Sequence, residues 1–226
     1  MRRSWHLAIT SIVAAVLATL PTTTAAAASA VLTVGSSGGP AVSAGDILWG
    51  VLVGNAVFTN GSNTSQKITC TSSRIDGVVN SNPPPPGQAT FTITSWTFGS
   101  CSISGVSGAS VTGITTNATS SCPYNATVSD SSSSNNVTIS AATGSGCSTI
   151  MFTVGIIVFG THQSCVYSPH NGSLTGSWPV GGSSITFSNQ SLNKSSGPGT
   201  CFSSLAFSAT YSVTDHTQGG GAVVLN

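Results

Sequence analysis

The sequence predicts an all-β protein: a single antiparallel β-sandwich or Greek-key barrel of about 11–13 short strands over residues 31–226, after a cleaved signal peptide at residues 1–30. Val, Ile, Thr and aromatic residues come in strand-length runs separated by clusters of Gly, Ser, Asn and Pro. Residues 207–214 alternate strictly between apolar and small polar side chains, as in an antiparallel strand with one buried face. No stretch after residue 30 has the periodicity of a helix.

Residues 1–30 contain the three regions of a secretory signal peptide. Arg2 and Arg3 precede the apolar run LAITSIVAAVLATL, and the triplet ASA at residues 28–30 forms a small-x-small cleavage site. A membrane anchor is the alternative, but the apolar run is short for a membrane span. The paired arginines leave both the general secretory route and the twin-arginine route open.

Cysteine usage agrees with export. The predicted mature part holds an even number of cysteines, which suits a disulfide-stapled extracellular protein: Cys70, Cys101, Cys122, Cys147, Cys165 and Cys201. Six cysteines allow fifteen pairings, and the sequence does not select one. Sequential pairing is our working prediction, with each bridge closing a loop of about 25 to 37 residues and stabilising the fold by roughly 3.5–4 kcal/mol.

The first half of the predicted domain contains strand regions at residues 31–34, 47–59, 67–79 and 89–101. Residues 47–59 are apolar on both faces and are interrupted by Gly50 and Gly54, which favours two central strands over a helix. Four consecutive prolines cannot donate to a strand ladder, so residues 81–88 are a polyproline-like connector.

Within residues 89–101 the apolar positions change face between Ile93 and Trp96, which predicts a bulge or a strand that crosses from one sheet to another.

The second half contains further predicted strands. Residues 149–159 are the most apolar stretch of the mature chain and are too short for a membrane-spanning helix, so they indicate a central core strand. Ile185 and Phe187 alternate with polar neighbours, and the strict alternation at residues 207–214 follows. The remaining short strands are expected at residues 111–116, 125–128, 137–141 and 222–225.

Charge is scarce. Charged residues make up 4% of the chain and there is no glutamate. Loss of Arg2 and Arg3 with the signal peptide would take the formal charge from +1 to about −1. Such a surface cannot neutralise several phosphates, which excludes nucleic acid as an expected partner. The four aspartates are spread along the sequence, which also makes a glycosidase carboxylate pair improbable.

One motif matches a hydrolase pattern. Residues 35–39, GSSGG, fit G-x-S-x-G after a strand, with Ser37 as the nucleophile. A nucleophile elbow needs a helix next, whereas Pro40 follows here, so a flexible entry loop is the favoured interpretation. Partners for a triad would come from His162, His170, His216, Asp130 and Asp215, but sequence gives them no geometry.

Two other groups carry metal-like residue types. His162, Cys165 and His170 lie in a short span, yet no carboxylate is near and Cys165 is expected in a disulfide. Asp215 and His216 lie at a strand end before three glycines, where turn formation is favoured over a cation or catalytic role. We therefore predict no catalytic, cofactor-binding or metal-ligating residue.

Aromatic residues offer the remaining candidate. Trp49, Trp96, Trp178 and Tyr124 could form a stacking surface for sugar, and Trp178 is the best placed because Pro179 indicates a loop. Core packing is the more common role of tryptophan in sandwiches.

Several segments resemble small exported actinobacterial proteins with a signal peptide and a disulfide-stapled all-β body. They are KITCTSS at residues 67–73, SNPPPPGQAT at 81–90, FGSC at 98–101, CVY at 165–167, NGSLTGS at 171–177, SITFSNQSLNK at 184–194, CF at 201–202, FSATYSVTD at 207–215 and AVVLN at 222–226. The resemblance covers most of the mature chain and implies the pairs Cys70–Cys101 and Cys165–Cys201, with Cys122 and Cys147 as an addition. It implies no function and transfers no catalytic residue.

These observations predict an exported, non-enzymatic protein of the extracellular space or cell envelope, with a binding or structural role and a surface, glycan or protein partner that the sequence does not identify. A membrane-active or channel-type β-protein is the alternative, because residues 47–58 and 150–159 could face lipid in an oligomer. A secreted serine hydrolase built on Ser37 is the second alternative.

Overall fold

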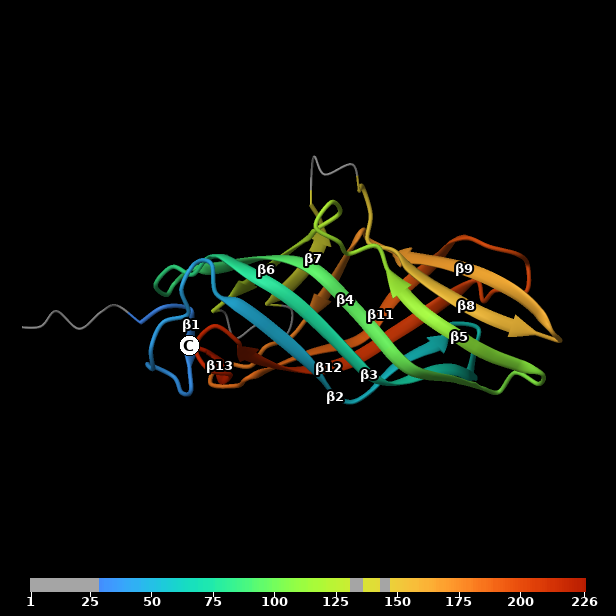
Figure 1. Ribbon diagram of the computed structural model, residues 1–226, viewed down its shortest axis with the longest axis horizontal. Coiled ribbons are helices and arrows are strands. Elements are labelled where there is room, and N and C mark those ends of the chain that lie inside the picture. Colours follow the sequence, from blue (N-terminus) through green and yellow to red (C-terminus); the bar gives the residue numbers. More distant parts are fainter. Residues whose placement is uncertain (1–28, 131–135, 143–146) are drawn as a thin grey trace, which may run out of the picture.

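The computed structural model describes residues 29–130, 136–142 and 147–226, and over these residues the chain is all-β (Figure 1). The predicted signal peptide, including its twin arginines, lies outside the described residues except for Ser29 and Ala30. The strands are β1 (Leu32–Val34), β2 (Ile47–Asn60), β3 (Asn63–Ser81), β4 (Gln88–Ser104), β5 (Ala109–Thr116), β6 (Tyr124–Ser129), β7 (Val137–Ala141), β8 (Phe152–Val158), β9 (Thr161–Pro169), β10 (Ser173–Gly176), β11 (Ser184–Ser196), β12 (Ser204–Asp215) and β13 (Gly221–Leu225).

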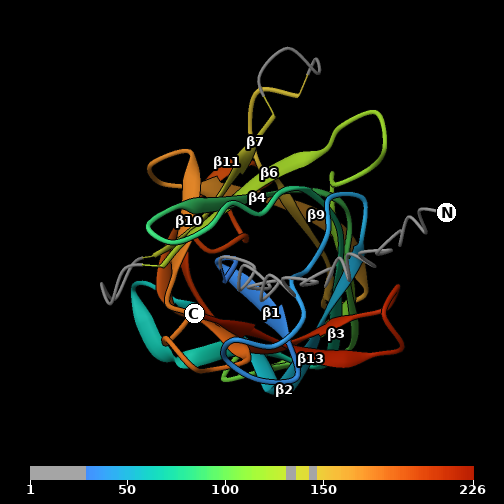
Figure 2. The same cartoon turned by 90° about the vertical axis from the view of Figure 1, so that its left-hand side faces the viewer.

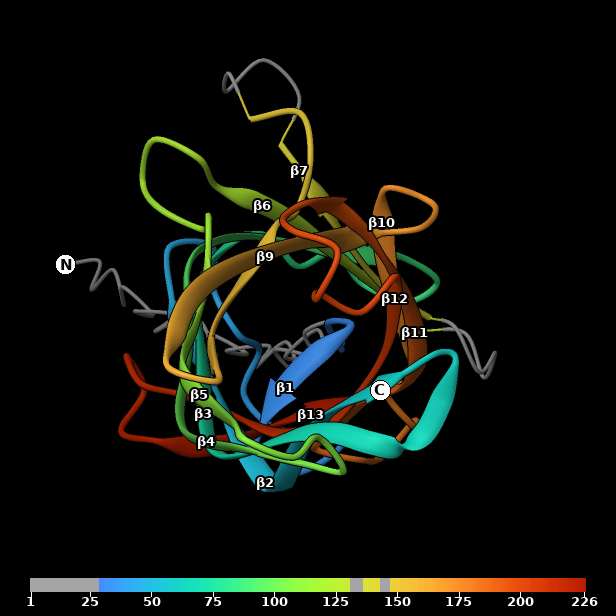
Figure 3. The ribbon, with the colours of Figure 1, turned by 90° about the vertical axis from the view of Figure 1, so that its right-hand side faces the viewer.

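The strands form one antiparallel sheet that closes on itself. β12 pairs with both β11 and β2, and the pairing continues through β3, β4, β5, β8 and β9 back to β11. The two end-on views show this closed ring (Figures 2 and 3). The predicted all-β class is confirmed, and the sheet is barrel-like in its closure.

The two ends of the ring differ in their strands. The first half of β4 pairs with β6, from Gln88↔Ser129 to Ile93↔Tyr124, and its second half meets β5 at Thr97↔Thr115. β6, β7 and β10 therefore complete one end, and β5, β8 and β9 complete the other. The predicted irregularity between Ile93 and Trp96 is confirmed, because the β3–β4 register shifts there and both side chains are buried.

β2, β3 and β4 span 14, 19 and 17 residues, longer than the short strands that the sequence predicts. The two strands expected in residues 47–59 are one bent strand, β2. Its register with β3 shifts between Val51 and Ala56, and Gly54 adopts φ +77° inside the shift. A glycine tolerates this conformation, so Gly54 bends the strand without ending it.

β1 lies across the end of the ring that β6, β7 and β10 complete, where it pairs with β13 at Leu32↔Leu225 (Figures 2 and 3). The proline-rich connector between β3 and β4 holds it there: the Val31 N–H donates to the Pro83 carbonyl at 2.9 Å, and Asn82 Nδ2 donates to the Leu32 carbonyl at 2.8 Å. The predicted role of the prolines as a connector between strands is confirmed.

The disulfides are Cys70–Cys101, Cys122–Cys147 and Cys165–Cys201, which is the sequential set. The first joins register partners on β3 and β4. The second joins the β5–β6 connection to the β7–β8 connection, and the third fastens the β11–β12 loop to β9. Three disulfides are typical of proteins that fold in an extracellular or otherwise oxidising compartment.

Candidate functional site

Aromatic rings fill the middle of the closed sheet. Phe58, Trp96, Phe152 and Phe207 come from four different strands, and their ring centroids lie 4.9–5.9 Å apart in edge-on or tilted arrangements. Rings at these distances gain energy beyond the area that they bury. On either side of this aromatic cluster lies a small apolar cavity, and the two cavities share no lining residue.

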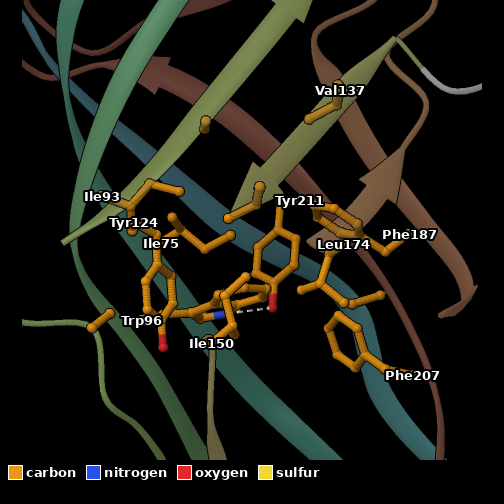
Figure 4. Packing of buried hydrophobic residues seen from close by; sticks show 14 of the residues in the cluster. Ile75, Ile93, Trp96, Tyr124, Val137, Ile150, Leu174, Phe187, Phe207 and Tyr211 are labelled. Atoms are coloured by element: carbon orange, nitrogen blue, oxygen red, sulfur yellow. Dashed lines mark hydrogen bonds between the residues drawn. The ribbon is translucent and has the colours of Figure 1, made fainter. Parts of the chain in front are cut away.

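A short hydrogen-bonded chain satisfies the polar atoms of the cluster. Trp96 Nε1 donates to Tyr211 Oη at 3.0 Å. Figure 4 marks this hydrogen bond with a dashed line. Tyr211 Oη also lies 2.9 Å from Ser73 Oγ, which donates to the Thr97 carbonyl. Burial raises the pKa of Tyr211 to about 12. Each of these polar groups has a hydrogen-bond partner within the core, which indicates a packing role.

The larger cavity occupies the end of the ring formed by β5, β8 and β9 and has a volume of about 150 Å³. We call it the mouth cavity. Its walls are aliphatic apart from a few aromatic, sulfur and hydroxyl groups, and none of them carries a charge. They are formed by Ile68, Ile103, Val106, Ala109, Val154, Ile156, Val158, Cys165, Tyr167, Thr200 and Phe202.

The loop between β11 and β12 forms one wall of the mouth cavity, and the Cys165–Cys201 disulfide holds it. Tyr167 Oη donates to the Phe202 carbonyl at 3.2 Å, and burial raises the pKa of this tyrosine to about 12. Gly197 has φ +124°, and a Cβ there would lie 2.8 Å from the Ser164 carbonyl oxygen. Glycine is therefore required where the loop passes close to β9.

The mouth cavity reaches solvent at its rim. Thr200 is exposed, and Val106, Val158 and Phe202 are half-buried. Phe159, at the β8–β9 turn beside the rim, is 81% exposed. An apolar molecule could therefore enter past these side chains and lose its contact with water among the buried aliphatic groups.

The smaller cavity, about 60 Å³, lies toward the opposite end and is lined in part by Trp178. Trp178 is 2% exposed, donates from Nε1 to the Gly182 carbonyl at 2.7 Å, and exchanges backbone hydrogen bonds with the Asn136 side chain. Its expected exposure in a loop is wrong: the segment is a loop, but Asn136 fixes the tryptophan against the core. No face of the ring is left for sugar stacking from solvent.

Trp49 instead lies on the outer face of β2. His216 stacks on its ring at 3.7 Å, and the Arg74 guanidinium lies 3.9 Å from the ring centroid. Both faces of the indole are thus covered by side chains. The remaining aromatic candidates, Trp96 and Tyr124, are buried in the core.

Ser37 is part of a turn at the N-terminal end of the described chain. Its hydroxyl donates to Asn226 Oδ1 at 2.7 Å, and the Gly38 N–H donates to the same oxygen. No histidine hydrogen bonds to Ser37 among the described residues, and β1 is followed by turns and bends with no helix. The GSSGG segment thus anchors the C-terminal residue.

His162 and His170 do not belong to any group of described side chains that could hold a metal ion. Cys165 is in a disulfide, and His170 Nδ1 contacts Asn193 Nδ2 at 2.7 Å. Within residues 29–130, 136–142 and 147–226, no three or more His, Cys, Asp or Glu side chains gather in a group that could hold a metal ion. The same residues contain no helix with the length and hydrophobicity needed to cross a membrane.

Comparisons with known proteins add no assignment: no family model matches the chain, and no curated protein or solved structure shows significant similarity to it.

Sequence reasoning missed the mouth cavity because its walls come from five strands and two loops. The available signal was the apolar character of residues 149–159: on the buried face of β8, Val154 and Ile156 line the cavity, and Phe152 is buried in the core.

Proposed function

We propose that the protein is a non-enzymatic extracellular binding protein that holds a small apolar molecule, or the apolar end of a larger one, in the mouth cavity. The observation that carries this proposal is a preformed cavity of about 150 Å³ with uncharged, mostly aliphatic walls that opens at one end of the closed sheet. The mouths of closed β-sheets are a common place for small-molecule sites.

The volume indicates the size of the ligand. An engineered cavity of about 150 Å³ lined by aliphatic and aromatic side chains stays free of water and binds benzene. A single ring or a short alkyl chain would therefore fill the mouth cavity, and any polar remainder of the ligand would extend past the rim near Thr200.

The two wall hydroxyl groups already have hydrogen-bond partners within the protein, which favours an apolar ligand. The Tyr167 hydroxyl is engaged with the Phe202 carbonyl, and the Thr200 hydroxyl donates to Gln163. Recognition would then rest on shape and on the burial of apolar surface, at about 25 cal/mol per Å². The packed aromatic cluster behind the cavity argues for binding in preference to the channel-type alternative, because it fills the axis of the sheet.

Ala109→Phe tests the proposal. Ala109 is a half-buried residue of the cavity wall, so a phenyl ring at this position can occupy the cavity. Fluorescence titration with the apolar probe N-phenyl-1-naphthylamine should show saturable binding to the natural protein and at least about tenfold weaker binding to Ala109→Phe, equivalent to about 1.4 kcal/mol.

Val53→Phe is the matched control, since Val53 lies on the outer face of β2 and is 53% exposed. It should bind the probe as the natural protein does, with circular dichroism confirming that both variants fold. Equal probe binding by Ala109→Phe and Val53→Phe would contradict the proposal.

A further inference from the structure

Two of the four acidic residues of the chain meet at the end of the ring opposite the mouth cavity. Asp46 immediately precedes β2, and Asp215 is the last residue of β12, at the end where β1 and β13 lie (Figure 1). Asp46 is 7% exposed and Asp215 is 0% exposed. The sequence separation of 169 residues conceals this pair, which forms only because β2 and β12 are neighbours at Leu48↔Asp215.

Gln218 bridges the two carboxyl groups. Its backbone N–H donates to Asp215 Oδ1 at 3.0 Å, and its Nε2 donates to Asp46 Oδ2 at 2.7 Å. The Ser43 N–H donates to the same Asp46 oxygen at 2.7 Å. Through these two bonds Gln218 brings the two carboxyl groups to the same place at this end of the sheet.

One oxygen of the pair lacks a partner. Asp215 Oδ2 is buried and accepts no hydrogen bond from any described residue. Across the described ranges the one ion pair is Arg74–Asp76, so no Lys, Arg or His side chain neutralises Asp46 or Asp215. A buried carboxylate without a counter-charge is costly, and a second one bonded to the same Gln218 raises that cost. A cation bound at the pair would lower that cost, as would a proton on one of the two carboxyl groups.

We propose that Asp46 and Asp215 form a Ca²⁺ site that ties the β1–β2 connection to the β12–β13 hairpin. Calcium takes carboxylate, amide and carbonyl oxygens in flexible geometry. Besides the two carboxylates, the Gln218 amide and the Ala41 carbonyl are at hand, because Gln218 Nε2 lies 3.3 Å from that carbonyl oxygen. A rotation of the Gln218 amide presents its oxygen to the cation in place of its nitrogen.

The oxygen atoms available at the pair favour calcium over softer metals. All donors at the pair are oxygen or amide groups, and the neighbouring His216 ring is stacked on Trp49 on the outer face. Zinc and copper prefer thiolate and imidazole ligands, whereas magnesium demands rigid octahedral geometry. Extracellular calcium modules bind with Kd values of about 10⁻⁴–10⁻³ M, which suits a site completed by water.

Thermal unfolding of the full chain after chelation tests the site. Added CaCl₂ at about ten times Kd should raise Tm by roughly 3–6 °C, and calorimetric titration should show one Ca²⁺ per chain. Asp215→Asn should abolish both effects while leaving the chelated protein at least as stable as the natural one, because it removes a buried like charge. Asp76→Asn is the matched control: it removes the carboxylate that pairs with Arg74 and should keep the full calcium response.

The calorimetric and Tm measurements on the natural protein test the proposal even if a variant folds poorly. Absence of calorimetric heat and of a Tm rise with CaCl₂ would overturn the proposal, as would an equal rise with MgCl₂. If the Tm of the chelated protein does not change with CaCl₂ but rises as the pH falls, the carboxyl pair holds a proton in place of calcium, and the proposal is wrong. Ala109→Phe should retain the calcium response, so failure of this site and failure of the mouth cavity are distinguished.

Discussion

At the scale of single residues, Tyr211 shows how a chain with few charges satisfies polar groups in its core. Its hydroxyl accepts from Trp96 Nε1 and lies beside Ser73 Oγ, and all three residues are buried. A donor left without a partner in such a place costs the full desolvation of that group. The Tyr211 hydroxyl therefore stabilises the core in addition to the apolar area that the ring buries.

Tyr211→Phe should lower the free energy of unfolding by about 1–3 kcal/mol, because it leaves the Trp96 indole N–H without an acceptor. Urea unfolding followed by tryptophan fluorescence measures the change. Tyr167→Phe is the comparison: its hydroxyl donates to a partly buried carbonyl of Phe202, so its loss should cost less, about 0.5–1.5 kcal/mol. A larger cost for Tyr167→Phe than for Tyr211→Phe would contradict this account.

At the scale of elements, the loop between β11 and β12 depends on its disulfide. Two side-chain hydrogen bonds connect it to β9, from Tyr167 to the Phe202 carbonyl and from Thr200 to Gln163. The Cys165–Cys201 bridge connects it to β9 across 36 residues of sequence. This bridge is the covalent link between the loop and β9, so we expect the shape of the mouth cavity to depend on it.

Replacing both cysteines, Cys165→Ser with Cys201→Ser, should destabilise the fold by about 3–4 kcal/mol and weaken binding of the apolar probe. Thermal unfolding and the probe titration measure the two effects. The control replaces Cys122 and Cys147 in the same way. This bridge touches no wall of the mouth cavity, so stability should fall while probe affinity stays unchanged. Equal loss of affinity in both double variants would show that the loop does not shape the site.

At the scale of the whole molecule, closure of the sheet buries every tyrosine of the chain. Burial raises the pKa of Tyr124, Tyr167 and Tyr211 to about 12 each. The phenols stay neutral in the folded state at a pH where they ionise in an unfolded chain, near 10. Folding and tyrosine ionisation are thus coupled.

The structure should lose stability as the pH rises from about 10 to 12. Each tyrosine has a higher pKa in the folded protein than in the unfolded chain, so its contribution to the free energy of unfolding is complete below pH 10 and is lost by pH 12. Between these two pH values the loss is about 1.4 kcal/mol per pH unit for each tyrosine. Phenolate absorbance should therefore rise together with the loss of native circular dichroism. In urea the same absorbance should titrate near pH 10. Full phenolate absorbance at pH 10 in a still native protein would contradict the prediction.

Local pattern was enough to predict much of the architecture. Apolar runs between Gly, Ser, Asn and Pro clusters located most of the strands, though not β9 and β10, and the strict alternation at residues 207–214 coincides with β12. The change of face between Ile93 and Trp96 predicted the irregularity in β4. These features depend on neighbours a few residues away, so the sequence carries them directly.

The sequence by itself determined that the chain forms an all-β body with an even set of cysteines and almost no charge. Tertiary structure alone decided that the sheet closes, that Trp178 is buried, and that Gln218 joins Asp46 to Asp215. The reason is physical: ring closure through β2 and β12 brings together residues far apart in the chain, and no local periodicity encodes which strand meets which. The mouth cavity and the carboxylate pair exist only after that closure.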